Sequence, residues 1–90
     1  MKHCLCIRVA GRVQGVCFRY YADMEASRLG VTGYVRNMPD GSVEALICGT
    51  LEQLNAMQQW LSHGPEMAHV THVQVSEKTV EPMPGDFCIR

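Results

Sequence analysis

The segment GRVQGVCFRY, residues 11–20, combines the residue types and spacing that could bind an anion. Gly11 and Gly15 bracket a short loop that follows an apolar strand pattern, and Arg19 falls in the first turn of a predicted helix. Such a loop turns backbone N–H groups inward, and a helix N-terminus adds free N–H groups and a partial positive charge. The guanidinium of Arg19 adds a full charge and a planar fork that matches two phosphate oxygens. The segment predicts an oxyanion or phosphate site built mostly from backbone.

Two side chains of this segment have simpler interpretations. Arg19 could pair with Asp23, one helical turn further along, which is common for a helix arginine. Cys17 lies at the expected helix N-terminus, where thiols become reactive. Cysteine phosphatases, however, hold phosphate within a Cys-x5-Arg loop, and Cys17 and Arg19 are too close in sequence to form one. We therefore interpret Cys17 as an oxidisable bystander and not as a nucleophile.

The rest of the chain alternates between strand and helix patterns, without an internal repeat or a linker. Alternating apolar residues predict strands, and apolar residues at helical spacing predict helices. The predicted elements are strands at 3–10, 31–37, 42–48, 70–79 and 87–90 and helices at 18–29 and 51–62. The residues expected to face the core are Leu5, Ile7, Val9, Phe18, Ala22, Ala26, Leu29, Val43, Ala45, Ile47, Leu51, Leu54, Met57, Leu61, Val73 and Val75.

This order of elements predicts one domain over residues 1–90 with an α+β fold. Two split β-α-β units indicate a ferredoxin-like βαββαβ sandwich, an antiparallel sheet with two helices on one face, plus a short C-terminal strand. Right-handed crossovers bring the end of the second strand back to the end of the sheet that carries the glycine loop. Asn37 is thereby predicted to lie near Arg19. Asn37 could also serve only as a turn residue before Met38-Pro39.

Composition excludes several classes of function. Eight Lys and Arg against nine Asp and Glu give a net charge of −1, a weak basis for binding nucleic acid or an anionic membrane. The outer face of the predicted sheet carries no aromatic residue on its two central strands, which argues against RNA. No run is long and apolar enough to span a membrane, and the N-terminus does not resemble a secretion signal, so a cytoplasmic location is expected.

No metal or other cofactor is expected. The cysteines contain no Cys-x-x-Cys, and the four histidines lack any recognised ligand spacing with them. These histidines are His3, His63, His69 and His72.

The chain resembles the acylphosphatase family over its whole length, through two blocks. Residues 11–19 (GRVQGVCFR) look like the first signature of the family. Residues 33–37 (GYVRN), continuing through 40–44 (DGSVE), look like the second. The resemblance implies a small hydrolase that cleaves the carboxyl-phosphate bond of acyl phosphates to carboxylate and inorganic phosphate, without a metal.

The resemblance also implies a site. Its two functional side chains correspond to Arg19, which would hold the phosphoryl group, and Asn37, which would orient the attacking water. The backbone of Gln14, Gly15, Val16, Cys17 and Phe18 would complete the phosphate site. The expected ligands are a small-molecule acyl phosphate and, as a product inhibitor, inorganic phosphate; nucleic acid and membrane are not expected as partners. The protein is expected to be a monomer. The alternative to an enzyme is a phosphate-binding module without catalysis.

The five cysteines leave two interpretations open. In the predicted topology Cys4 and Cys6 begin the first strand, and Cys48 ends the neighbouring antiparallel strand, all on the outer face of the sheet. If one pair forms a disulfide, Cys4–Cys48 is the better guess of pair, because both residues lie at strand ends. The alternative is reduced thiols that pack as small apolar groups, which a cytoplasmic location favours.

Overall fold

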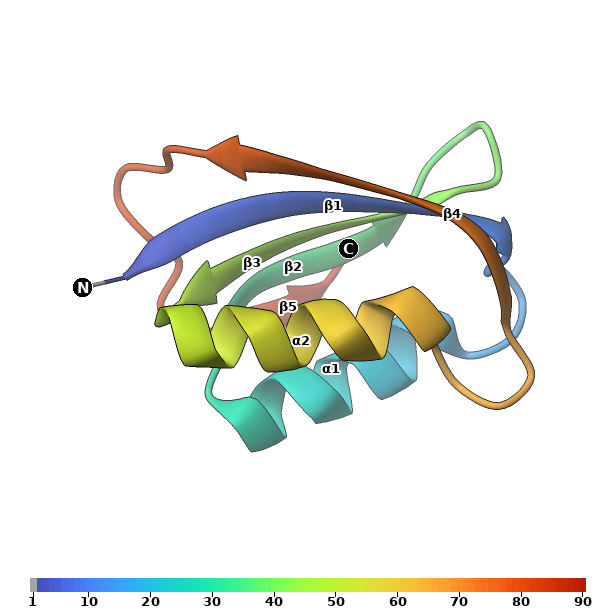
Figure 1. The fold of residues 1–90 in the computed structure, drawn as a ribbon, viewed down its shortest axis with the longest axis horizontal. Helices are drawn as coiled ribbons and strands as arrows, with labels where there is room; N and C mark the ends of the chain where they lie inside the picture. The colour runs from blue at the N-terminus through green and yellow to red at the C-terminus, as the bar shows by residue number, and fades with distance from the viewer. Residues whose placement is uncertain (1) are drawn as a thin grey trace.

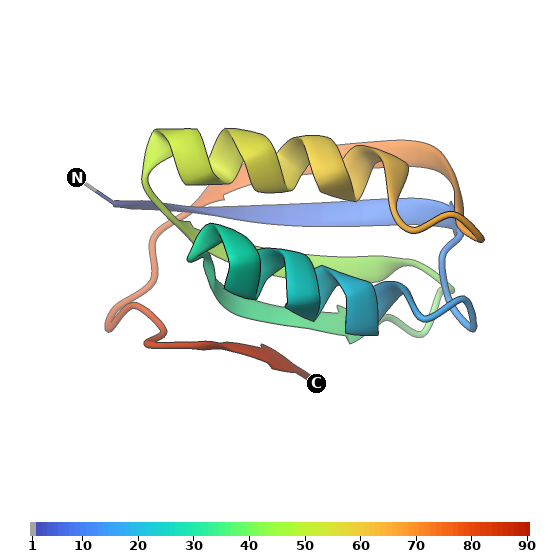
Figure 2. The ribbon, with the colours of Figure 1, turned by 90° about the horizontal axis from the view of Figure 1, so that it is seen from below.

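The computed structural model describes residues 2–90, which form a five-stranded sheet with two helices. The elements are β1 (His3–Arg12), α1 (Phe18–Leu29), β2 (Thr32–Asn37), β3 (Val43–Gly49), α2 (Leu51–His63), β4 (His69–Lys78) and β5 (Phe87–Ile89). Both helices lie on the same face of the sheet (Figures 1 and 2). The ferredoxin-like α+β fold predicted from the sequence is therefore confirmed.

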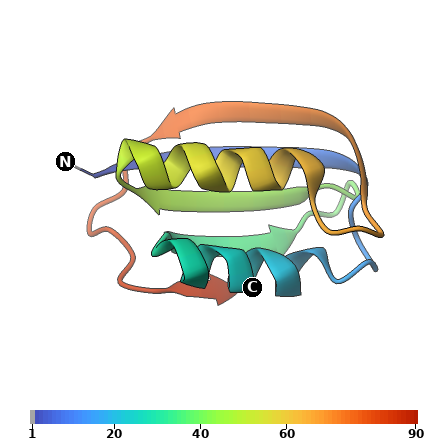
Figure 3. The same ribbon diagram turned by 60° about the horizontal axis from the view of Figure 1, so that its bottom comes forward.

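The strands follow the order β4-β1-β3-β2-β5 across the sheet (Figure 3). The pairs β1–β3, β1–β4 and β2–β3 are antiparallel, so β1 and β2 run in the same direction. As a result, the loop after β1 and the turn after β2 lie at the same end of the molecule (Figure 1). This is the convergence that the crossover argument predicts.

The last strand makes the sheet mixed. β5 pairs in parallel with β2, with Phe87 opposite Gly33 and Ile89 opposite Val35. The backbone N–H of Gly33 donates to the oxygen of Asp86 at 2.9 Å, which begins this pairing. The sequence left the partner of this strand open, and the structure assigns it to the edge of the sheet beside the start of α1.

The core lies between the sheet and the helices. Its fully enclosed residues come from every element except β4 and β5: Ile7, Val9, Val13, Phe18, Ala22, Ala26, Val31, Val35, Val43, Ala45, Ile47, Leu54, Met57 and Leu61. Most of the residues expected to face the core do so. Two expectations are wrong: Leu51 is 63% exposed and Val75 is 43% exposed. Leu51 lies in the first turn of α2, and Val75 lies on β4, an edge strand that pairs on one side only.

Cys4 and Cys48 are joined by a disulfide at the end of the sheet remote from the glycine loop. The two residues are direct partners in the β1–β3 ladder, with Cα atoms 4.1 Å apart. Together with Leu46 they form a small second cluster on the outer face, flanked by Tyr34 and Val80. The other three thiols are free, with Cys6 half-buried and Cys17 and Cys88 exposed.

Within residues 2–90, neither helix has the length and apolar character needed to cross a bilayer.

Candidate active site

The loop between β1 and α1 is shorter than the glycine spacing predicts, because β1 continues to Arg12. A bulge between Ala10 and Gly11 shifts the pairing with β4 at this point. Gly11 has a φ of 123°, and a Cβ there would collide with the carbonyl oxygen of His69, so only glycine fits. The loop proper then spans residues 13–17 and turns at Gly15, whose φ is 75°.

The loop delivers the chain into a helix whose N-terminus has no side-chain cap. Cys17 is the N-cap residue, with a left-handed φ of 60°, and its side chain accepts no hydrogen bond from the first turn. The first turn of α1 also contains no acidic residue. By contrast, α2 begins with a capping box, in which Thr50 Oγ1 accepts from the N–H of Gln53 and Gln53 Oε1 accepts from the N–H of Thr50. The N–H groups at the start of α1 are therefore available to an external acceptor.

A cavity of about 350 Å³ lies at this helix end. It is lined by Val13, Gly15, Cys17, Phe18, Arg19, Tyr20, Asn37 and Ile89. The structure thus brings Arg19 and Asn37, from α1 and from the end of β2, to the walls of one cavity. Gln14 and Val16, the other predicted site residues, do not line it. Tyr20, which also lines the cavity, is 57% exposed.

Arg19 is oriented by the far end of the chain. Its Nη1 donates a hydrogen bond of 2.9 Å to the main-chain oxygen of Arg90, just after β5. Ile89, the neighbour of Arg90, contributes to the cavity wall. Sequence reasoning missed both residues, because a three-residue strand carries no periodic pattern that indicates its partner.

The Gln14 side chain turns away from the cavity. Its Nε2 donates to the carbonyl oxygens of Met38 and Ser42, each at 2.9 Å. These two carbonyls belong to the turn that follows Asn37. The loop and the turn that carry the cavity residues are thereby joined directly.

No histidine or carboxylate lines this cavity within the described part of the chain. The side chains there that can carry a proton are Cys17, Arg19 and Tyr20. In residues 2–90, no three His, Cys, Asp or Glu side chains gather in a way that could hold a metal ion. The cavity therefore offers hydrogen-bond donors and positive charge but no carboxylate or imidazole base.

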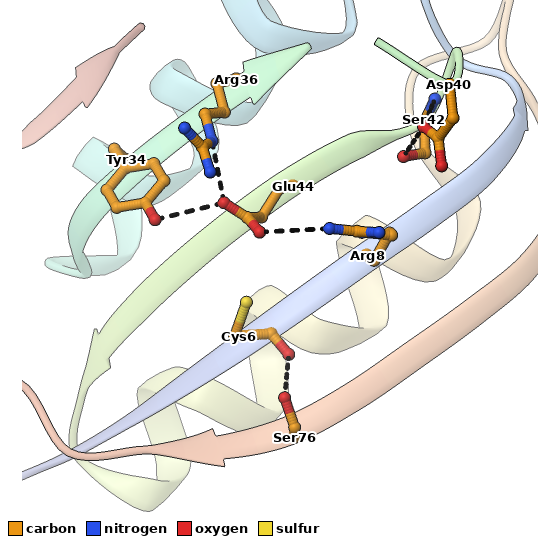
Figure 4. A network of polar contacts seen from close by, with 8 residues as sticks. All are labelled: Cys6, Arg8, Tyr34, Arg36, Asp40, Ser42, Glu44 and Ser76. Atoms are coloured by element: carbon orange, nitrogen blue, oxygen red, sulfur yellow. Dashed lines mark hydrogen bonds and ion pairs between the residues drawn. The ribbon is translucent and has the colours of Figure 1, made fainter. Parts of the chain in front are cut away.

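Glu44 contacts the strand that carries Asn37 on the outer face of the sheet, away from the helices (Figure 4). Glu44, on β3, accepts hydrogen bonds from Arg36 Nε at 2.9 Å and from Tyr34 Oη at 3.2 Å, and it forms an ion pair with Arg8 at 3.5 Å. Burial opposes ionisation of this carboxyl, but the hydrogen bond and charge of Arg36, with help from Tyr34 and Arg8, hold the pKa of Glu44 below its ordinary value. Three strands are thus joined around one carboxylate directly behind the cavity strand.

A larger groove of about 580 Å³ runs between α1 and the segment that links α2 to β4. Val16 of the loop borders it, together with Tyr21, Met24 and Trp60. Its side chains are mainly apolar, and Tyr21 is 45% exposed there. The groove contains neither Arg19 nor Asn37, so we place the candidate site in the smaller cavity.

Comparison with known proteins identifies the family to which the chain belongs. The sequence pattern of the acylphosphatase family matches residues 5–89. The chain belongs to the acylphosphatase family. An acylphosphatase from Nocardioides sp. is 51% identical over 79 residues, which cover 88% of this chain and 80% of the relative. The resemblance noted in the sequence is thereby confirmed.

Solved acylphosphatases have the same fold. The structure of an acylphosphatase from Coxiella burnetii superposes with a TM-score of 0.92 at 37% identity and covers 99% of this chain and 93% of its own. The acylphosphatase from Bacillus subtilis gives 0.91 at 36% identity, with 100% and 99% covered. The activity of the chain is accordingly hydrolysis of acyl phosphates to a carboxylate and inorganic phosphate, and its substrate is a small molecule.

Proposed function

We propose that Arg19 and the backbone N–H groups of residues 14–18 bind the phosphoryl group of the substrate, and that Asn37 orients the attacking water. The observation that supports this most directly is that Arg19 and Asn37 line one cavity at an uncapped helix N-terminus. An anion there would receive N–H donors, the helix dipole and a guanidinium fork. The α2 N-terminus is a poorer candidate, because Gln53 Oε1 and Thr50 Oγ1 already accept from the N–H groups of Thr50 and Gln53.

The chemistry requires little beyond positioning and charge neutralisation. An acyl phosphate already has a good leaving group, so catalysis must hold the phosphoryl group, spread its developing charge and place a water in line. The oxygen of that water forms a bond to phosphorus as the bond from phosphorus to the acyl oxygen breaks. The carboxylate departs with the electron pair of the broken bond, and the donors around the phosphoryl oxygens stabilise the transition state.

Asn37 suits the water-orienting role because its amide has both an acceptor and donors. It cannot take the proton of the water, since an amide oxygen is not a base at neutral pH. With no histidine or carboxylate among the described cavity residues, we infer that the proton passes to a phosphoryl oxygen of the substrate itself. The products are then a carboxylate and a protonated inorganic phosphate, which balances the one water consumed.

A hydrolysis assay tests the proposal. The purified protein is expected to hydrolyse benzoyl phosphate and acetyl phosphate with saturation kinetics, and inorganic phosphate is expected to inhibit competitively as the product of the same site. Inhibition that is not competitive would place the product outside the proposed site.

We further propose that the protein acts as a cytoplasmic monomer without a cofactor. Cell fractionation tests the location. The alternative is an oxidising compartment, where disulfides such as Cys4–Cys48 are more usual. Size-exclusion chromatography with light scattering tests the oligomeric state.

A further inference from the structure

The side chain of Gln14 joins two parts of the cavity wall that are remote in sequence. Its Nε2 donates one hydrogen bond to Met38 O and one to Ser42 O, both 2.9 Å long and both partly buried. Because a glutamine amide has two N–H hydrogens, this contact uses its full donor capacity. The acceptors lie on the turn between β2 and β3, whereas Gln14 lies in the loop between β1 and α1.

The turn that Gln14 contacts is stiff on its own. Met38 N–H donates to Ser42 O at 2.8 Å, and Gly41 N–H donates to Met38 O at 3.1 Å. Asp40 Oδ1 accepts from both the N–H and the hydroxyl of Ser42 (Figure 4). A rigid turn moves as one body, so two hydrogen bonds to it determine where the whole turn sits relative to the loop.

Asn37 is the residue directly before this turn. Its backbone is held on one side by the β2–β3 ladder, where it is the partner of Val43. On the other side its peptide with Met38 is held by the turn, and hence by Gln14. Asn37 lines the cavity and Gln14 does not, so the side chain of Gln14 can influence the reaction only through the elements it joins.

We propose that Gln14 is a positioning residue, whose side-chain amide sets the placement of Asn37 relative to the phosphate-binding loop. This inference rests on the proposed function of Asn37. In-line attack tolerates little error, and a displacement of about 1 Å can reduce a rate by about 10²-fold. Loss of the Gln14 contact should therefore reduce kcat while the loop and Arg19 continue to bind phosphate.

A double-mutant cycle over Gln14→Met and Asn37→Ala tests the inference. The methionine keeps the length of the side chain and removes both donors. Gln14→Met alone is expected to lower kcat on benzoyl phosphate by about 10-fold or more, while the inhibition constant of inorganic phosphate changes less than about 2-fold. In the Asn37→Ala background, Gln14→Met should lower kcat by less than about 2-fold further, because the group it positions is gone.

Each other outcome overturns the inference. Losses that multiply in the double mutant would mean that Gln14 acts independently of Asn37. Weaker phosphate inhibition in Gln14→Met would mean that Gln14 shapes the phosphate site itself. An Asn37→Ala variant with the kcat of the native protein would overturn both this inference and the proposed role of Asn37, so the two failures are distinguishable.

Gln53→Met is the matched control. Gln53 also bridges two elements, with Nε2 donating to Leu29 O at 3.1 Å and Oε1 accepting from Thr50 N–H at 2.9 Å, but it lies at the opposite end of the fold. Its loss should lower the Tm and leave kcat unchanged. A parallel fall in kcat would show that any lost bridge impairs catalysis, and the inference would fail.

A measurement on the native protein covers the case in which Gln14→Met does not fold. The side-chain NH₂ protons of Gln14 should exchange with water more slowly in NMR spectra than those of Gln59, which is exposed on α2. Equal exchange rates would show that the Gln14 contact is absent in solution.

Discussion

Nη1 of Arg19 donates a hydrogen bond of 2.9 Å to the main-chain oxygen of Arg90, across a sequence separation of 71 residues. Arg90 is itself anchored, since its N–H donates to Val35 O at 2.9 Å and its guanidinium lies 4.1 Å from the ring centre of Tyr34. The Arg19 guanidinium is thus held by Arg90, the residue that follows β5, and not by Asp23 on its own helix. Pre-orientation of this kind reduces the entropy that would otherwise be lost when a phosphoryl group binds.

Arg19→Gln should remove both phosphate binding and turnover. The substitution keeps a polar side chain but shortens it and deletes the positive charge, so kcat/KM should fall by about 10³-fold or more. Arg19→Lys is the matched variant: it keeps the charge, loses the fork and should recover part of the phosphate affinity. The measurements are steady-state kinetics and competitive inhibition by phosphate. Inhibition equal to that of the native protein in Arg19→Gln would contradict the assignment.

Asn37→Ala should separate binding from chemistry. An Asn37 that orients water contributes to the transition state and little to the ground state, so kcat should fall by at least about 10²-fold while phosphate inhibition persists. Initial rates and inhibition constants measured on the same preparation decide this. A variant that keeps kcat and loses phosphate affinity would show that Asn37 binds phosphate or supports the turn.

Activity should survive EDTA, because helix N–H groups and Arg19 supply the positive charge that a metal supplies in other phosphatases. Replacement of all four histidines should likewise leave kcat largely intact, since none lines the cavity. The variant combines changes at His3, His63, His69 and His72. Circular dichroism should first establish that it folds. A folded variant without activity would mean that a histidine base acts on the reaction.

The Cys4–Cys48 bridge should be detectable by thiol counting. Air-exposed protein, denatured and titrated with a thiol reagent, should show three free thiols, with the bridged peptides mapping to residues 4 and 48. A sequence separation of 44 corresponds to about 4 kcal/mol of stabilisation on the chain-entropy account. Cys4→Ala/Cys48→Ala should therefore unfold at lower urea concentration. Five titratable thiols would rule the bridge out.

Glu44→Gln should make the free energy of unfolding depend less on pH in the acid range. The pKa of Glu44 is lowered in the folded state, chiefly because Arg36 overcomes the opposing effect of burial. A lowered folded-state pKa contributes stability above the unfolded-state pKa, and this contribution is lost as the pH falls through the folded-state value. Urea unfolding at pH 7 and at about pH 3 should show that Glu44→Gln loses less unfolding free energy on acidification than the native protein does. Parallel losses would contradict the role of this network.

Asp40→Asn is the companion experiment for the turn. Hydrogen bonds from the hydroxyl and N–H of Ser42 lower the pKa of Asp40. Asp40→Asn should likewise reduce the loss of unfolding free energy between pH 7 and about pH 3. The reduction should be smaller than for Glu44→Gln, because the Asp40 carboxylate is exposed to solvent. A larger effect at Asp40 than at Glu44 would mean that the turn, and not the Glu44 network, dominates acid unfolding.

Local sequence determined most of the elements. Phe18, Ala22 and Ala26 repeat at helical spacing and are all buried in α1, and Val43, Ala45 and Ile47 alternate and are all buried in β3. These patterns are readable because one face of each element must be apolar to form a core. The same patterns, with right-handed crossovers, predicted that Asn37 returns to the end of the sheet that holds Arg19, and both residues line one cavity.

Tertiary structure alone decided the contacts that do not repeat along the chain. β5 could have joined either edge of the sheet, and its pairing with β2 is what brings Arg90 to Arg19. The direction of the Gln14 side chain depends on a turn formed far along the chain. Periodicity reports whether a face is buried, but a single hydrogen bond between distant backbones leaves no periodic trace, so the orientation of the site residues emerges only when the whole sheet is assembled.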